Sequence, residues 1–445
     1  MQVRKLYEYS NRKYFLIFVP VLVVQIIDAI IGNLSDIYKD FTISPVGISS
    51  FVIMAVIAII GQYFLVGMAK NKSSQQSIKT IHFNIYRKSE TVIQHSVVII
   101  MIIILFQILF YSEYSIFLIK VALITSFGFA VYSMGALTGW FLTWFKIKKN
   151  LILLLFSLAS LFIVFHLLSM IVLSITILDE KSSIIDSESE VIFDPNLPGT
   201  LITISNSLHT YFGVIAFILF WSATVVILRH NIHRIGKTKF WILMSTPIVA
   251  FSGYYLTFFQ SIAGTPSILE DPINGIVIPV LVIICTGTIA IIIIGVSFSA
   301  IAKPLKNNTV IKDFLTITSY GFILFFVTTL TSIGGAGFPP YGLINLILVG
   351  PFSFLIVNSL YRSAIAVSED VELRRFIKNT TNRELDLLGE IGIAQMYQQL
   401  ENKIMEASKS NAFKLSQQTG IEPSLTDEEI RNYLKQIVME RQVSK

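Results

Sequence analysis

The chain has 445 residues, of which 53% are hydrophobic and 14% are charged, and its mean hydropathy is +0.70. Because soluble proteins carry about 25% charged residues, this composition excludes an ordinary cytosolic enzyme, a disordered chain and a nucleic-acid-binding domain. The single cysteine, Cys285, excludes a disulfide framework and every metal site that needs several cysteines. We therefore expect a membrane protein that contacts the lipid bilayer and no nucleic acid.

Ten segments are apolar enough to cross a bilayer, which takes about 20 mostly apolar residues in a helix. Segment 151–178, for example, contains no charged residue. The sequence thus predicts an all-α, polytopic helical membrane bundle of about ten transmembrane helices within residues 1–361. The predicted spans lie near 15–31, 46–69, 92–111, 116–145, 151–178, 201–228, 239–259, 274–301, 314–333 and 343–361.

The positions of the basic residues predict the orientation of the bundle. If the N-terminus lies inside and all ten segments cross, the inner loops and span edges hold 19 Lys and Arg residues before the tail. The outer ones hold 3. Cytoplasmic flanks collect Lys and Arg because these residues resist translocation. We therefore expect a multi-pass protein of the cell membrane with its N-terminus and C-terminus in the cytoplasm.

Residues 362–445 are much more polar, and we expect them to form a small amphipathic helical tail in the cytoplasm. Thr381 and Glu384 have the spacing of a capping box, and residues 409–425 read as a linker. The apolar stripe of such helices needs cover, which the bundle, a second tail helix or a protein partner could supply. The predicted stripe consists of Leu385, Leu388, Ile391, Met396, Leu400 and Ile404.

Asp28 is an ionisable residue inside the first predicted span, three residues from its outer end. Ionisable residues in spans are costly and are the first place to look for function. At 1.5 Å per residue the carboxyl group lies about 5 Å deep. Two interpretations remain open, a side chain that reaches interfacial water and a cation or proton site near an outer vestibule.

His166 and His209 lie in the fifth and sixth predicted spans, which are consecutive and therefore expected to be neighbours. Met170 is one turn from His166 on the same helix face and near the depth of His209. A group of this kind could ligate copper, or the two imidazoles could hold a haem iron between the helices. The alternative is hydrogen bonding between helices, with Met170 as packing.

Glycine and proline interrupt several predicted spans or their ends. Gly350-Pro351 is expected to kink the tenth span, because proline removes one backbone hydrogen bond. Such breaks can mark the discontinuous helices of transporters. Ten spans could also divide into an inverted repeat of five plus five, although the two halves share no sequence similarity that supports this division.

The stretch from Leu228 to Leu243, Leu-Arg-His-Asn-Ile-His-Arg-Ile-Gly-Lys-Thr-Lys-Phe-Trp-Ile-Leu, follows Ser205-Asn-Ser-Leu-His209. Together, these two stretches resemble a recurrent pattern in uncharacterised archaeal multi-span integral membrane proteins. The resemblance covers about residues 200–260 and implies only an integral membrane protein of archaeal type. No functional residue is carried over by it.

Three classes of function remain, and no catalytic motif accompanies them, so we do not expect an enzyme. The ten spans, Asp28 and the glycine–proline breaks favour a transport-type or channelling bundle. The acidic outer loop, residues 179–200, and the tail helices would suit a membrane sensor or an assembly partner that signals through the tail. His166, His209 and Met170 would suit a haem- or copper-binding membrane subunit.

Overall fold

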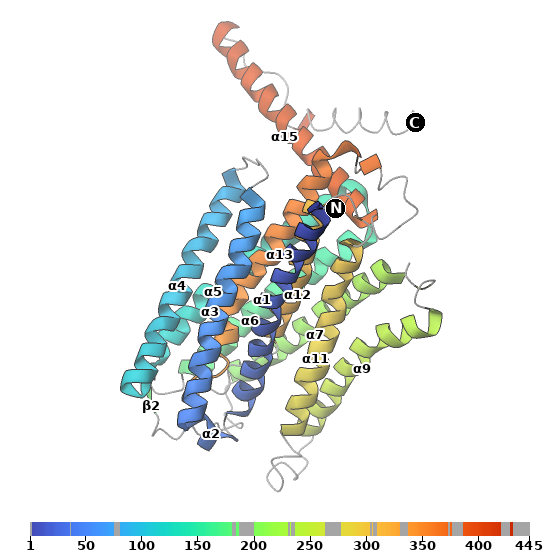
Figure 1. The fold of residues 1–445 in the computed structure, drawn as a ribbon. Helices are drawn as coiled ribbons and strands as arrows, with labels where there is room; N and C mark the ends of the chain where they lie inside the picture. Colours follow the sequence, from blue (N-terminus) through green and yellow to red (C-terminus); the bar gives the residue numbers. More distant parts are fainter. Residues whose placement is uncertain are drawn as a thin grey trace.

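A computed structural model describes residues 2–35, 37–74, 81–179, 184–186, 200–229, 232, 236–262, 277–302, 305, 309–329, 337–372, 374–375, 386–419 and 428–429. Over these ranges the fold is an all-α bundle, as predicted, with two short strands (Figure 1). The helices are α1 (Gln2–Leu34), α2 (Lys39–Ile43), α3 (Pro45–Ser74), α4 (Ile81–Tyr111), α5 (Ile116–Lys148), α6 (Leu151–Asp179), α7 (Thr200–Leu228), α9 (Lys237–Ile262), α11 (Ile278–Ala302), α12 (Thr309–Thr328), α13 (Leu343–Glu369) and α15 (Asp386–Thr419).

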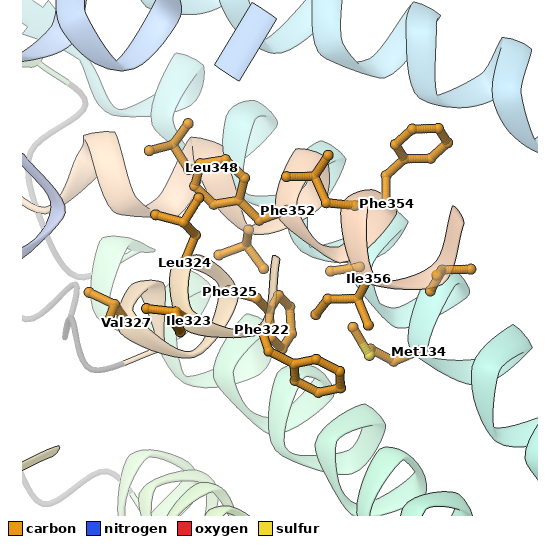
Figure 2. Packing of buried hydrophobic residues seen from close by; sticks show 14 of the residues in the cluster. Met134, Phe322, Ile323, Leu324, Phe325, Val327, Leu348, Phe352, Phe354 and Ile356 are labelled. Atoms are coloured by element: carbon orange, nitrogen blue, oxygen red, sulfur yellow. The ribbon is translucent and has the colours of Figure 1, made fainter. Parts of the chain in front are cut away.

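Helix α13 is the central element of the bundle. Every residue from Leu343 to Ser368 is buried, and the helix packs against α1, α3, α4, α5, α12 and α15. A helix that is apolar on all sides needs neighbours on all sides. Figure 2 shows part of this core, where side chains of α12 and α13 such as Phe325 and Phe352 lie between the two helices.

The predicted break at Gly350-Pro351 lies inside α13, which continues through it. Pro351 has no N–H to donate to the carbonyl of Ile347. The hydroxyl of Ser126 on α5 donates to that carbonyl instead, at 3.1 Å, and accepts the N–H of Gly350 at 3.0 Å. A Cβ atom on Gly350 would lie 2.9 Å from the carbonyl oxygen of Ser126. Glycine at this position therefore lets α5 approach α13 closely enough for both hydrogen bonds.

Among the helices that the structure describes, nine are long and apolar enough to cross a membrane. They are α1, α3, α4, α5, α6, α7, α11, α12 and α13. The remaining predicted span, 239–259, which is the seventh along the chain, lies on α9, which is a 26-residue helix but is not among these nine. Helix α9 packs against α11, and the indole N–H of Trp221 on α7 donates to the carbonyl of Met244 at 2.8 Å. The multi-pass helical bundle is thus present, and the count of ten crossings stays a prediction.

The beginning of α1 and the end of α13 lie at the same end of the bundle, and α15 extends beyond that end (Figure 1). We call this end of the bundle, where α1 begins, the N-terminal end. At the opposite end lie α2 and two strands that the sequence did not indicate, β1 (Glu113–Ser115) and β2 (Ile184–Asp186). They pair antiparallel, with Tyr114 opposite Ile185. This pairing ties part of the predicted outer loop, residues 179–200, to the turn between α4 and α5.

Helices α13 and α15 extend further towards the C-terminus than predicted. Helix α13 runs through Glu369 rather than ending at 361, because Arg362 lies buried against an aromatic ring instead of marking the edge of the span. Helix α15 runs through Thr419, so residues 409–419 of the predicted linker are helical. The capping box at Thr381 and Glu384 lies outside the described residues.

Candidate functional site

Polar side chains, four of them buried and one half-buried, gather where α3 and α4 pack against the central helix. They are Gln62 and Lys70 on α3, Glu90 and Gln94 on α4, and Asn358 on α13, and we call this group the polar seam. Gln62 and Asn358 are 0% exposed, and Glu90 is 1% exposed. Polar and ionisable groups inside membrane-spanning helices are costly and often functional. The polar seam is therefore the first candidate for function.

The helix phase places these residues on faces that the bundle covers. On α3, Gln62 is seven residues before Ala69, whose carbonyl accepts a hydrogen bond from Asn358 Nδ2 at 3.5 Å. Positions seven apart lie on one helix face. On α4, Glu90 follows four residues after Tyr86, whose ring stacks on Phe354 of α13 at a centroid distance of 5.4 Å. Both faces thus point to the same side of α13.

Lys70 links the three helices of the polar seam. Its ammonium group forms an ion pair with the Glu90 carboxylate and donates to the hydroxyl of Thr91 at 2.7 Å. It also lies 5.8 Å from the centre of the Phe354 ring. A buried carboxylate without a partner is strongly unfavourable, so Lys70 is what makes the burial of Glu90 tolerable.

Several polar atoms of the seam have no hydrogen-bond partner within the described part of the chain. These atoms are both amide atoms of Gln62, the Nε2 of Gln94 and the Oδ1 of Asn358. A buried polar group left unpaired costs about 1–3 kcal/mol, and such groups in natural proteins are normally satisfied by protein or water. The seam therefore offers amide donors and acceptors to water or to a small polar molecule.

An aromatic cluster lies beside the polar seam towards the N-terminal end. The guanidinium of Arg362 lies 4.4 Å from the centre of the Phe83 ring. Tyr361 stacks on Phe83 and on Trp140, with centroids 5.4 and 4.2 Å apart. A cation over an aromatic face is stabilised by the ring quadrupole, which explains how an arginine occupies a buried position on α13.

Asp28, predicted as an intramembrane polar residue, is 0% exposed and does not reach water. One carboxylate oxygen accepts the backbone N–H of Gly342 at 2.8 Å, and the other accepts that of Asn345 at 3.0 Å. These N–H groups lie at the start of α13, where the first turn of a helix has no internal acceptors. An anion there also interacts favourably with the helix dipole. The geometry favours a structural cap over the cation or proton site.

The surroundings of Asp28 are packed and hydrogen-bonded. Asn345 Nδ2 donates to the carbonyl of Gln25 at 2.8 Å, and Gln25 Nε2 donates to the carbonyl of Leu324 at 3.2 Å. The Tyr341 hydroxyl donates to the carbonyl of Gly47 at 2.6 Å. Burial, together with the nearby Asp28 carboxylate, raises the pKa of Tyr341 to about 12. Helices α1, α3, α12 and α13 are thus fixed together near the start of α13, at the end of the bundle opposite the N-terminal end.

His166 on α6 and His209 on α7 are neighbours, as predicted. Their rings stack with centroids 4.1 Å apart at an interplanar angle of 24°, and the Nδ1 of His166 lies 3.0 Å from the carbonyl oxygen of His209. Met170 is buried on the same helix as His166. Rings this close leave no space for a porphyrin between them.

Metal ligation by this pair is also unfavourable in its present geometry. Imidazole nitrogens bind metals along lone pairs in the ring plane, so two nearly parallel stacked rings do not aim at one ion between them. No group of three or more His, Cys, Asp or Glu side chains that could hold a metal lies in the described ranges. The geometry favours the hydrogen-bonding alternative, and haem or copper binding through His166, His209 and Met170 stays a prediction.

Sequence reasoning missed the polar seam because charged residues were taken to lie outside the spans. Arg87, Lys88 and Glu90 delayed the predicted start of the third span to residue 92, whereas α4 begins at Ile81. The available signal was the spacing of Tyr86, Glu90, Gln94 and Val97, which recur every three to four residues on one helix face.

The fold and the buried residues define the class of this protein as an all-α, multi-pass helical bundle whose apolar helices suit a lipid bilayer. In comparisons with known proteins, no family model, no curated protein and no solved structure matches the chain. The resemblance of residues 200–260 to archaeal membrane proteins therefore stays a prediction.

Proposed function

We propose that this protein is a transport-type membrane protein that carries a small polar solute along the polar seam. One observation carries the proposal. Gln62 is fully buried within a membrane-spanning helix, and neither of its amide atoms has a partner among the described residues. A polar group in this state is tolerated where it faces water or a bound solute, because the cost of leaving it unpaired is not repaid otherwise.

The charges of the polar seam favour a neutral solute. The ammonium of Lys70 and the carboxylate of Glu90 neutralise each other, and the remaining seam residues, Gln62, Gln94 and Asn358, are amides. An amide offers both hydrogen-bond donors and acceptors. A small molecule that carries hydroxyl or amide groups can therefore replace water along the seam without bringing a charge into the low-dielectric interior.

We place the protein in the cell membrane with its N-terminal end in the cytoplasm. The support is the distribution of basic residues, 19 against 3, along the chain. The location of the start of α1 and the end of α13 at one end of the bundle fits an even number of crossings (Figure 1). In this orientation Lys70 and Glu90 lie on the cytoplasmic side of Gln62.

The proposal is tested by solute flux into proteoliposomes. Vesicles with and without the purified full-length protein are mixed with hyperosmotic glycerol, urea, acetamide or sodium chloride, and their shrinkage and re-swelling are followed by stopped-flow light scattering. We expect the protein to accelerate re-swelling with at least one neutral solute and not with sodium chloride. If protein-containing vesicles re-swell like empty ones with every solute, the proposal is wrong for this class of molecule.

The tail supports a second candidate function, a membrane sensor that signals through α15. The indole N–H of Trp144 on α5 donates to Gln395 Oε1 at 3.0 Å, and both side chains are buried. Helix α15 then extends away from the bundle (Figure 1), where a protein partner could bind. In this case, removal of residues 379–445 would leave the bundle folded and abolish partner co-purification, and unchanged co-purification would contradict the sensor function.

A further inference from the structure

We infer that the ion pair between Lys70 and Glu90 is a gate that closes the polar seam at the N-terminal end of the bundle. The inference rests on the proposed transport function, because it assigns a role to two residues of the same seam. The gate is nevertheless a separate claim from transport, because it states only that the ion pair controls whether water reaches the seam.

The positions of the two residues along their helices place them between the bundle end and the seam amides. Glu90 is nine residues from the start of α4, which is about 14 Å along the axis, and Gln94 lies one turn, about 6 Å, further in. On α3, Gln62 lies eight residues before Lys70, about 12 Å further from the same end. A solute that enters from the N-terminal end therefore meets the ion pair before either glutamine.

The ion pair also joins two helices that are weakly packed on each other. Helices α3 and α4 pack more closely against α13 than against one another. Lys70 connects them through Glu90 and Thr91. The next contact along this pair of helices is between the rings of Tyr63 and His95, with centroids 5.7 Å apart. Separation of Lys70 from Glu90 would therefore release α3 from α4 at this depth.

The two partners differ in their access to solvent. The side chain of Lys70 is 19% exposed, whereas that of Glu90 is 1% exposed. A lysine side chain is long and can turn its ammonium group towards water. The carboxylate of Glu90 cannot be left alone at low cost. A solute with hydroxyl or amide N–H groups would replace Lys70 as the donor to Glu90, so that solute entry and opening occur together.

Another ion pair on α3 provides a matched comparison. Lys72 lies two residues after Lys70 and forms an ion pair with Asp313 on α12. This pair therefore joins α3 to a helix outside the seam. The side chain of Asp313 is 12% exposed. Loss of this pair removes a similar charge interaction near the same end of α3 without uncovering the seam.

Cysteine labelling tests the gate without knowledge of the solute. Cys285 is replaced by alanine and Gln94 by cysteine in the full-length protein, which is then placed in lipid nanodiscs and treated with a membrane-impermeant maleimide. We expect slow labelling with Lys70 and Glu90 intact. In Glu90→Gln and in Lys70→Met, the labelling rate should rise at least tenfold. Asp313→Asn should leave it unchanged, and the charge exchange Lys70→Glu with Glu90→Lys should restore protection.

The gate is overturned if Glu90→Gln and Lys70→Met label at the rate of the intact pair, or if Asp313→Asn raises the rate as much as they do. Thermal unfolding checks that the variants are folded, and Lys70→Arg, which keeps the pair, should stay protected. Failure of the transport proposal can be told apart from failure of the gate. Faster labelling without flux of any solute keeps the gate and removes transport, whereas flux with unchanged labelling keeps transport and removes the gate.

Discussion

The carboxylate of Asp28 on α1 accepts the backbone N–H of Gly342, 314 residues further along the chain, at 2.8 Å. Its second oxygen accepts the N–H of Asn345 at 3.0 Å. The first span thus caps the helix at the centre of the bundle. This cap holds the start of α13 in place, while the polar seam lies further along α13 towards the N-terminal end. We therefore expect Asp28 to determine stability and the seam to determine function.

Replacement of Asp28 by alanine should lower the free energy of unfolding by about 2–6 kcal/mol, because two buried N–H groups lose their acceptor at about 1–3 kcal/mol each. Asp28→Asn retains one acceptor oxygen and should lose less. The measurement is reversible unfolding of the purified protein in mixed detergent. Equal stability of the alanine variant and the native protein would contradict the cap.

Gly32→Ala should also destabilise the bundle. A Cβ atom on Gly32 would lie 3.0 Å from the backbone nitrogen of Gly342 and 3.2 Å from its Cα, so α1 and α13 would have to separate, at a cost of about 1–3 kcal/mol. Gly67 on α3 is the control, because a Cβ atom there meets nothing within 4 Å. Gly67→Ala should be neutral or stabilising by up to about 1 kcal/mol. Similar melting temperatures for the two variants would argue against this close contact.

His166→Phe should cost about 1 kcal/mol, since the ring stack on His209 is retained and one hydrogen bond is lost. If the pair only joins α6 to α7, neither EDTA nor equimolar copper should shift the melting temperature of the native protein. A Soret band, or a copper-dependent increase in melting temperature that His166→Phe abolishes, would instead support the haem or copper function.

Gln395→Ala should loosen α15 where it packs on the bundle. The buried indole N–H of Trp144 would lose its acceptor, at a cost of about 1–3 kcal/mol. Hydrogen exchange in residues 386–400 should become faster, with little change in α13. Unchanged exchange in α15 would show that the apolar contacts of Leu388 and Ile391 alone hold this helix.

The sequence predicts the helices well, because long apolar runs such as 151–178 have few alternatives to a spanning helix. It does not predict the partner of Asp28, since no local pattern indicates an N–H group 314 residues away. The strand pairing of Tyr114 with Ile185 is missed for the same reason. Glu90 and Arg362 are misread for a different reason, because a charged side chain marks a span edge only when no ion pair or aromatic ring covers it.

Solute flux through variants of Gln62 tests the central claim most directly. The re-swelling rate of proteoliposomes with the most permeant neutral solute is compared for the native protein, Gln62→Leu and Thr288→Val. Thr288 on α11 is the control, because its hydroxyl is also buried without a partner in the described part of the chain but lies outside the polar seam. We expect Gln62→Leu to lower the protein-dependent rate at least tenfold and Thr288→Val to leave it unchanged. Equal rates for all three proteins would contradict passage of solute along the polar seam.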